Sequence, residues 1–312
     1  MLLANIESLD HEGRGVAHVD GKAIFVEGAL PGEIVEYASY RRKRSYEKAH
    51  AVSVLRPSSQ RVAPPCPHFG TCGGCSMQHL NVAGQTAAKQ RVLENALWHI
   101  ARLKPEQVFP PIAGTGAAYR SRARLSVRHV DSKGGALVGF REKHSSYVAV
   151  MDSCLVLPAH VSALIPRLKS LVEAMSRPDR MPQIEVAVGA AQTALLLRHL
   201  EPLSVEDHDQ LRRFADAHGV IWYLQSKGLD SVVLFHPPDA PPLSYELPDF
   251  GLQMQFHPTE FTQVNQGVNR MLVRRAMALL KPRAGERIAD LFCGLGNFTL
   301  PIARMGARVL GI

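Results

Sequence analysis

The sequence has no long hydrophobic run, since no stretch of it approaches the roughly 18 consecutive apolar residues of a membrane-spanning helix. A secretory signal is also missing, because acidic residues occur near the start and no apolar core follows them. Internal repeats and low-complexity tracts are absent as well. These absences exclude a membrane protein, a secreted protein and a repeat protein. We therefore expect a cytoplasmic protein, and we expect it to be a monomer.

Cysteine is scarce, and its five residues are Cys66, Cys72, Cys75, Cys154 and Cys293. The first three form a C-x5-C-x2-C pattern, which in the cytoplasm is typical of a metal site rather than of disulfides. With Cys154 as a distant fourth, four thiolates are available for a [4Fe–4S] cluster or a structural Zn²⁺. The spacing favours the cluster, because zinc ribbons more often use two C-x2-C pairs. Zinc and unliganded thiols remain the alternatives.

The chain is basic: it has 36 Lys and Arg residues, 28 Asp and Glu residues and a formal net charge of +8. A basic surplus favours a polyanionic partner, because Lys and Arg release counterions from phosphates. The chain is otherwise 46% hydrophobic and 21% charged, which is ordinary for a globular protein. Charge alone leaves open both a nucleic-acid-binding protein and a basic protein without such a partner.

Residues 1–57 are predicted to form a small all-β domain. Alternating stretches over 15–19, 22–26, 33–38 and 49–55 are separated by turn signals such as Asp20-Gly21. Several short strands in so short a segment favour a barrel of the OB type. A basic run is expected between two of the strands, either as a solvated loop or as a loop that binds RNA phosphates. The run comprises Arg41, Arg42, Lys43 and Arg44.

Residues 58–257 are predicted to form a central α+β domain that begins with the cysteine-containing loop. An amphipathic helix is expected over about 85–103, and it is a candidate to pack against the domain that follows. Further helices are predicted over 160–175 and 205–218. Strands are predicted over 119–130, 184–188, 193–199, 220–225 and 231–236.

The strand predicted over 119–130 carries a row of arginines on one face, because side chains alternate between the two faces of a strand. The other face holds Ala123, Leu125 and Val127 and is expected to join the core. The arginine face either contacts RNA or pairs with acidic residues inside the central domain. Its members are Arg120, Arg122, Arg124 and Arg128.

Residues 258–312 are predicted to begin a Rossmann-like α/β domain. A helix is expected over 263–280, then a buried strand over 287–291, a turn over 292–297, a helix over 298–305 and a second strand from 307. A strand that leads into a glycine loop and a helix allows backbone N–H groups to approach a nucleotide-like ligand. We therefore predict a ligand loop that includes Asp290, Gly294 and Gly296, with a plain tight turn as the alternative. Cys293 is interpreted as a small core residue rather than as a nucleophile.

Four segments resemble the RNA uracil-C5 methyltransferase family, and they occur in the family's order along the whole chain. The segments CPHFGTCGGCSMQHL (66–80) and DLFCGLGNFTLPIA (290–303) resemble two of its motifs. The opening residues, IESLDHEGRGVA (6–17) with the following Phe25-Val26 and LPGE (30–33), resemble its TRAM domain, an OB-like RNA-binding barrel. The segment FTQVN (261–265) resembles a further motif just ahead of the methyltransferase core.

The resemblance implies a multidomain fold: an N-terminal OB-like β-barrel (TRAM), a central α+β domain with an Fe–S loop, and the start of a Rossmann-like α/β methyltransferase domain. It also implies that a [4Fe–4S] cluster is held by Cys66, Cys72, Cys75 and Cys154, with a structural or RNA-shaping role. S-adenosylmethionine is implied as the methyl donor, in contact with Gln263, Phe292 and Asn297. The combination of TRAM domain and cluster resembles the branch that forms 5-methyluridine in 23S ribosomal RNA.

The resemblance implies as well that the catalytic residues lie beyond this sequence. Family members continue with the acid that binds the cofactor ribose, a DPPR-like loop, the nucleophilic Cys and a Glu base. No catalytic residue is therefore assigned here, and the fragment is expected to be inactive. In the family a thiolate adds to C6 of uracil, so that C5 attacks the sulfonium methyl group and a base then removes the C5 proton. The target base has to leave its stack to react.

Two alternatives from other functional classes of protein remain open. A radical S-adenosylmethionine enzyme with a TRAM domain needs a C-x3-C-x2-C triad, whereas this chain has C-x5-C-x2-C and a fourth cysteine. A non-catalytic RNA-binding Fe–S protein is favoured if the natural polypeptide ends at residue 312. The gene sequence downstream of the last codon distinguishes these alternatives, because it shows whether a catalytic Cys follows.

Overall fold

The computed structural model describes residues 2–312 and divides the chain into two compact units, Met1–Ala113 and Gly114–Ile312. Each unit has a hydrophobic core of its own. Among residues 2–312, no helix combines the length and the hydropathy needed to cross a membrane.

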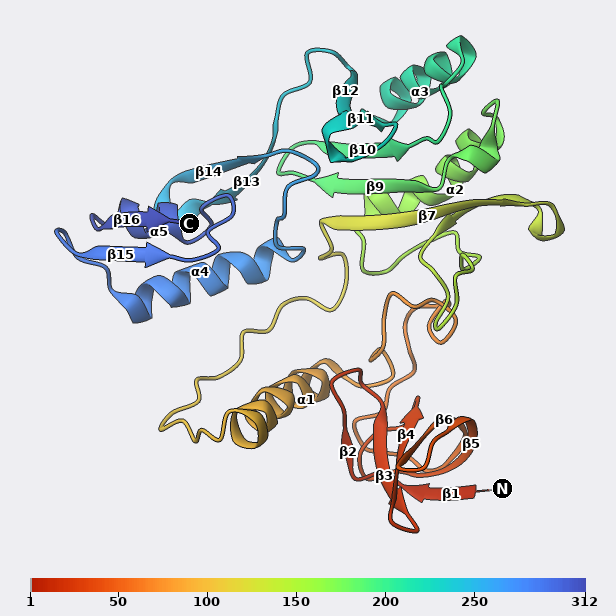
Figure 1. Ribbon diagram of the computed structural model, residues 1–312, viewed down its shortest axis with the longest axis vertical. Helices are drawn as coiled ribbons and strands as arrows, with labels where there is room; N and C mark the ends of the chain where they lie inside the picture. The colour runs from red at the N-terminus through yellow and green to blue at the C-terminus, as the bar shows by residue number, and fades with distance from the viewer. Residues whose placement is uncertain (1) are drawn as a thin grey trace. The chain divides into compact units, whose positions relative to one another are not determined.

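The first unit begins with a six-stranded sheet, shown in red in Figure 1. Its strand order is β1-β5-β6-β4-β3-β2, and every neighbouring pair is antiparallel except β4 and β6. The sheet encloses small and branched apolar residues such as Ala17, Ile24, Val26 and Val35. The strands are β1 (Leu2–Asn5), β2 (Ser8–Leu9), β3 (Gly15–Val19), β4 (Lys22–Glu27), β5 (Ile34–Arg42) and β6 (Tyr46–Arg56). The predicted N-terminal β domain is therefore confirmed.

The basic run was predicted as a loop between two strands, but half of it belongs to strand β5. Strand β5 continues through Arg41 and Arg42, so the turn to β6 comprises only residues 43–45. Arg41 pairs with Lys48 and Arg42 with Glu47 across the two strands. The sequence prediction ended the strand too early, because four consecutive cations obscure the alternation by which a strand is recognised.

The rest of the first unit is a long loop over residues 57–81 followed by one helix. Helix α1 (Val82–Asn95) begins at Asn81, whose side chain accepts a hydrogen bond from the backbone N–H of Gly84 at 2.8 Å. Such a cap satisfies an N–H group that has no partner within the helix. The helix continues into a π-helical turn, η1 (Ala96–Ile100). The predicted helix is present, and its packing against the last domain stays a prediction.

The second unit contains a six-stranded mixed sheet with the order β12-β11-β10-β9-β7-β8. Only β10 and β11 run parallel, and helix α3 (Val205–His218) makes the crossover between them. Helix α2 (Ala159–Glu173) precedes β9 in the chain. The strands are β7 (Arg122–Val130), β8 (Gly135–Gly139), β9 (Gln183–Val188), β10 (Thr193–Arg198), β11 (Val220–Gln225) and β12 (Val232–His236). All predicted strands and helices of this region are present, and β8 was not predicted.

Strand β7 shows the predicted separation of its two faces. Ala123, Leu125 and Val127 are buried, whereas Arg124 and Arg128 are exposed. Arg122 lies on the arginine face but is half-buried. The alternation therefore predicted correctly which side chains of this strand enter the core.

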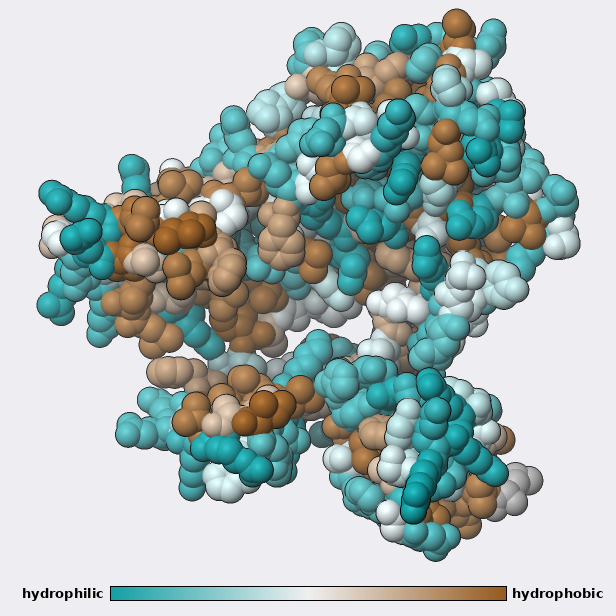
Figure 2. Space-filling model, viewed as in Figure 1, coloured by the Kyte–Doolittle hydropathy of each residue, from teal (hydrophilic) through white to brown (hydrophobic). Residues whose placement is uncertain are grey.

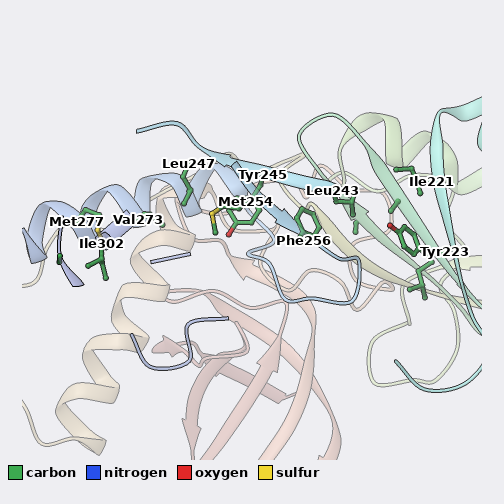
Figure 3. Packing of buried hydrophobic residues seen from close by; sticks show 14 residues of the cluster. Ile221, Tyr223, Leu243, Tyr245, Leu247, Met254, Phe256, Val273, Met277 and Ile302 are labelled. Carbon is green, nitrogen blue, oxygen red and sulfur yellow. The ribbon is translucent and has the colours of Figure 1, made fainter. Parts of the chain in front are cut away.

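A hairpin connects the central sheet to the last elements of the chain. It comprises β13 (Leu243–Leu247) and β14 (Leu252–Phe256), and it precedes α4 (Gln266–Leu280), β15 (Arg287–Asp290), α5 (Thr299–Arg304) and β16 (Arg308–Gly311). One hydrophobic cluster includes residues of β9 to β11, the hairpin, α4 and α5, as Figure 3 shows. Strands β15 and β16 are parallel, as the predicted start of a Rossmann-like domain requires. The predicted domain boundaries at residues 57 and 257 stay predictions, although this core extends to both sides of residue 257.

Candidate functional site

The glycine loop between β15 and α5 contains three residues with positive φ angles. Phe292, Gly294 and Gly296 have φ angles of 63°, 53° and 86°. A positive φ is unusual for a residue with a side chain, and such outliers cluster at functional sites. Glycine is required at Gly296, because a Cβ atom there would also lie 3.2 Å from the side chain of Leu300.

The Phe292 side chain is 97% exposed, and other apolar side chains around it also reach the surface. Figure 2 shows hydrophobic residues at the surface around β15, α5 and β16. The exposed residues there are Leu291, Phe292, Leu300, Leu310 and Ile312. An exposed aromatic ring beside a strained turn is available to stack on a planar ligand.

The two ends of the loop are fastened to the strands. Asp290 accepts a hydrogen bond from the Thr299 hydroxyl at 2.5 Å, so its carboxylate links β15 to α5. The backbone N–H of Cys293 donates to the carbonyl of Ile312 at 3.0 Å. The thiol of Cys293 lies so near Gly311 that a Cβ atom there would approach Sγ to 3.0 Å. Cys293 is only half-buried, so it is not the small core residue that the sequence predicted, although its thiol packs beside Gly311.

Asn297, a predicted cofactor contact, is held by two other side chains. Its Oδ1 accepts hydrogen bonds from Asn269 Nδ2 at 2.9 Å and from the Tyr245 hydroxyl at 3.0 Å. Its Nδ2 donates to Asn269 Oδ1 at 2.9 Å. Asn269 and Tyr245 were not predicted from the sequence as site residues. Asn269 shares the apolar face of α4, and a polar residue on such a face was the available signal.

Gln263, the other predicted cofactor contact, lies in an extended segment ahead of α4. The helix begins at Asn265, which caps it by accepting a hydrogen bond from Val268 N–H at 3.0 Å. The predicted helix start at residue 263 was therefore too early. Ser121 fastens this segment, because both its N–H (2.8 Å) and its hydroxyl (3.1 Å) donate to the carbonyl of Val264. The Gln263 side chain is exposed, and so is the ring of Phe261.

A pocket of about 320 Å³ lies where this segment enters α4. Side chains from several elements line it, among them Tyr119, Tyr245, Asn265, Gln266 and Arg270. No acidic residue lines this pocket, which is formed within residues 114–312. Its size falls within the range of about 300–1,000 Å³ that is typical of small-molecule sites. Aromatic, amide and guanidinium groups together suit a nucleotide.

The arginines proposed to bind RNA differ in how strongly they interact with other groups of the protein. Arg122 donates hydrogen bonds to the carbonyls of Pro258 and Glu260, and burial lowers its pKa. Arg124 forms an exposed ion pair with Glu185 at 3.0 Å. Arg120 forms a β-bridge with Asn265 through its backbone. In the first unit all four residues of the basic run are exposed, and Arg42 lies 3.6 Å from Glu47.

The four predicted cluster ligands are divided between the two units. Cys66, Cys72 and Cys75 lie in the loop over 57–81, and Cys154 lies ahead of α2. Cys72 and Cys154 are buried, and the other two are half-buried. Within residues 2–312, no group of three or more His, Cys, Asp or Glu side chains is arranged to hold a metal ion.

Comparisons with known proteins agree with the sequence motifs. A TRAM domain model matches residues 2–36, and a tRNA (Uracil-5-)-methyltransferase model matches residues 243–312. The 23S rRNA (uracil(1939)-C(5))-methyltransferase RlmD of Dechloromonas aromatica is 58% identical over 312 residues, which are 100% of this chain and 72% of that protein. RlmD of Azoarcus sp. is 59% identical with the same coverage. RlmD of Nitrosospira multiformis is 59% identical over 98% of this chain and 70% of its own length.

A solved structure shares the fold. The crystal structure of Pyrococcus abyssi tRNA (uracil-54, C5)-methyltransferase in complex with S-adenosyl-L-homocysteine has a TM-score of 0.70. It is 23% identical in sequence, and the match covers 99% of this chain and 72% of that one. The match confirms the multidomain arrangement of a β-rich N-terminal domain followed by a methyltransferase fold.

Proposed function

The chain belongs to the RlmD family of 23S rRNA (uracil-C5)-methyltransferases. We propose that it takes part in the transfer of a methyl group from S-adenosylmethionine to C5 of a uracil in 23S ribosomal RNA. Identity of 58–59% along the whole chain carries this proposal. The names of these relatives indicate uracil 1939 as the target. The TRAM match supports RNA binding by the first unit.

The methyl donor is proposed to bind at the glycine loop. Asp290, Phe292, Gly294 and Gly296 shape this loop, and Gln263 is proposed to contact the donor from the segment ahead of α4. The exposed Phe292 ring offers a face on which adenine can stack. S-adenosylmethionine supplies the electrophilic sulfonium methyl group. The residues of this chain are proposed to bind the donor and orient that methyl group, which lowers the barrier because the reacting atoms are held in position.

The neighbouring pocket is proposed to receive part of the RNA. Its polar lining lacks acidic groups, so it does not repel phosphate. A uracil can react only after it leaves its stack, and a pocket beside the donor site provides a place for an extruded or flanking nucleotide.

The reaction is tested with protein produced from the native gene, unmodified 23S ribosomal RNA and S-adenosylmethionine that carries a labelled methyl group. The expected product is 5-methyluridine at one position of 23S ribosomal RNA. A transcript with cytidine at that position should accept no label. Label that enters transfer RNA instead of 23S ribosomal RNA would contradict the proposed substrate.

The basic run of the first unit is expected to bind RNA phosphates through Arg41 and Arg44. Removing both side chains as Arg41→Ala with Arg44→Ala should weaken RNA binding and lower the slope of log K against log salt by about two, since each lost phosphate contact removes about one. The single variant Arg42→Ala is the control, because Glu47 already opposes that charge. An unchanged affinity and slope in the double variant would show that the run is only solvated surface.

We also propose that a [4Fe–4S] cluster is held by Cys66, Cys72, Cys75 and Cys154. Four thiolates are the donors that such a cluster requires. The Cys72 sulfur also accepts a hydrogen bond from Gly74 N–H at 3.4 Å, an interaction that tunes cluster sulfurs. The cluster is proposed to stabilise the loop over 57–81 and to take no part in methyl transfer.

The cluster is tested by metal analysis of protein purified without oxygen. We expect about four irons and four sulfides per chain. Cys72→Ala should lose the iron and render the loop sensitive to proteolysis, because ligand binding and folding are coupled. Cys293→Ala is the matched control and should retain the iron. Zinc without iron in the wild-type protein would exclude the cluster.

A further inference from the structure

Asn269 is a buried polar side chain that has no role in the proposed function as described above. It is 2% exposed and lies one turn after the N-cap of α4, on the face that also buries Val273 and Met277. A buried amide costs free energy unless its donor and acceptor are both hydrogen-bonded. An apolar residue at this position of α4 would avoid that cost, so the amide calls for another explanation.

The partner of Asn269 is the last residue of the glycine loop. Asn269 and Asn297 exchange two hydrogen bonds, each of 2.9 Å, between their side-chain amides. Tyr245 adds a third, because its hydroxyl donates to Asn297 Oδ1 at 3.0 Å. Burial raises the pKa of Tyr245, so its hydroxyl remains protonated and available as a donor. Asn297 Oδ1 thus has two donors, and a single N–H of the Asn297 amide is left.

These bonds join the two segments that are proposed to bind the methyl donor. Helix α4 starts directly after the segment that contains Gln263, and Asn297 closes the loop that contains Phe292. The strained φ of Phe292 persists only if the surrounding structure fixes the loop. The amide pair ties the loop to α4, and Tyr245 ties it to strand β13.

From this geometry we infer that Asn269 and Tyr245 are positioning residues for the methyl donor, which act through Asn297 by fixing the glycine loop against α4. The inference rests on the proposed function, since it requires that the loop binds S-adenosylmethionine. It also assigns the Asn297 side chain mainly to holding the loop, with one N–H group left for a ligand.

The inference is tested by calorimetric titration of the protein with S-adenosyl-L-homocysteine, together with the thermal unfolding midpoint. Asn269→Ala should raise the Kd about tenfold, the effect of losing roughly 1.4 kcal/mol. Tyr245→Phe should raise it several-fold, because one of the two donors to Asn297 is lost while the ring stays packed. The matched control is Val273→Ala, one turn further along α4 at a fully buried site. It should lower the unfolding midpoint and leave the Kd within about twofold.

A double variant separates positioning from a merely structural role. Because Asn269 acts through Asn297, adding Asn269→Ala to Asn297→Ala should cause no further loss of affinity. Additive losses, or a wild-type Kd in both Asn269→Ala and Tyr245→Phe, overturn the inference. If Asn269→Ala does not fold, Tyr245→Phe decides between the outcomes. A wild-type protein without affinity for S-adenosyl-L-homocysteine contradicts the proposed donor site itself.

Discussion

Replacing Glu33 by Ala is expected to destabilise the N-terminal β domain by about 3 kcal/mol, because a buried carboxylate that accepts hydrogen bonds from one charged and two backbone donors is lost. Glu33 is fully buried, and its carboxylate accepts hydrogen bonds from Arg61 Nε (2.6 Å), Leu30 N–H (2.8 Å) and Ser58 N–H (3.0 Å). Without it the Arg61 guanidinium and two backbone donors lose their acceptor. Arg61 also lies in the loop over 57–81, which carries three of the predicted cluster ligands, so that loop should become more sensitive to proteolysis.

The measurement is chemical unfolding of wild type, Glu33→Ala and the control Glu7→Ala. Glu7 pairs with His18 on the exposed surface of the same sheet, and its removal should leave the unfolding midpoint close to that of the wild type. Equal stability of Glu33→Ala and Glu7→Ala would show that the buried pair does not hold the domain together.

The stability that Glu33 provides should depend on pH. Burial alone would raise the pKa of this carboxyl, but the hydrogen bonds from Arg61, Ser58 and Leu30 outweigh it and lower the pKa below its ordinary value. A lowered pKa in the folded state means that the stabilisation is complete above the unfolded-state pKa and is lost as the pH falls through the folded-state pKa. Glu33→Gln should remove this part of the acid dependence.

Arg122→Ala is expected to destabilise the second unit by roughly 3 kcal/mol, because two hydrogen bonds from a charged donor are lost. These bonds hold the carbonyls of Pro258 and Glu260, which directly precede the segment that contains Gln263. The affinity for S-adenosyl-L-homocysteine should therefore fall as well, by about tenfold or roughly 1.4 kcal/mol. Arg122→Lys should recover little, since an ammonium group lacks the planar fork that reaches two carbonyls.

The neighbouring Arg124 supplies the matched control for this prediction. Its side chain is 70% exposed and pairs with Glu185 at the surface, so Arg124→Ala should change stability by at most about 1 kcal/mol. If Arg122 instead served RNA binding, its removal would weaken RNA affinity and leave unfolding and donor binding unchanged. That result would support the hypothesis that the arginine face of β7 contacts RNA.

For the arginine row of β7, the sequence predicts which side chains are buried but not which groups the arginines contact. Alternation along the strand correctly placed Ala123, Leu125 and Val127 in the core, because the pattern is local to one strand. The partners of Arg122 are more than a hundred residues away, and no local pattern indicates that Pro258 and Glu260 lie beside it. The glycine loop was likewise predicted from residues 290–297 alone, whereas the bonds from Tyr245 and Asn269 depend on tertiary packing.

Strand β8 and the β13–β14 hairpin were not predicted, and the reason differs between them. Strand β8 (GALVG) is short, fully buried and bounded by glycines, so it shows no alternation. The β13–β14 hairpin follows a proline-rich stretch that suggests a loop. This hairpin matters for the site because it supplies Tyr245, and the methyltransferase family match begins at residue 243, where β13 begins.

The reaction proposed for this protein is the C5 methylation of one uracil in 23S ribosomal RNA. The most direct measurement is mass spectrometry of nuclease-digested ribosomal and transfer RNA from the source organism, before and after deletion of the gene. Deletion should remove one 5-methyluridine from 23S ribosomal RNA and leave the 5-methyluridine of transfer RNA unchanged, and the restored gene should reverse the loss. Unchanged 5-methyluridine in 23S ribosomal RNA, or its loss from transfer RNA, would show that the protein does not carry out this reaction.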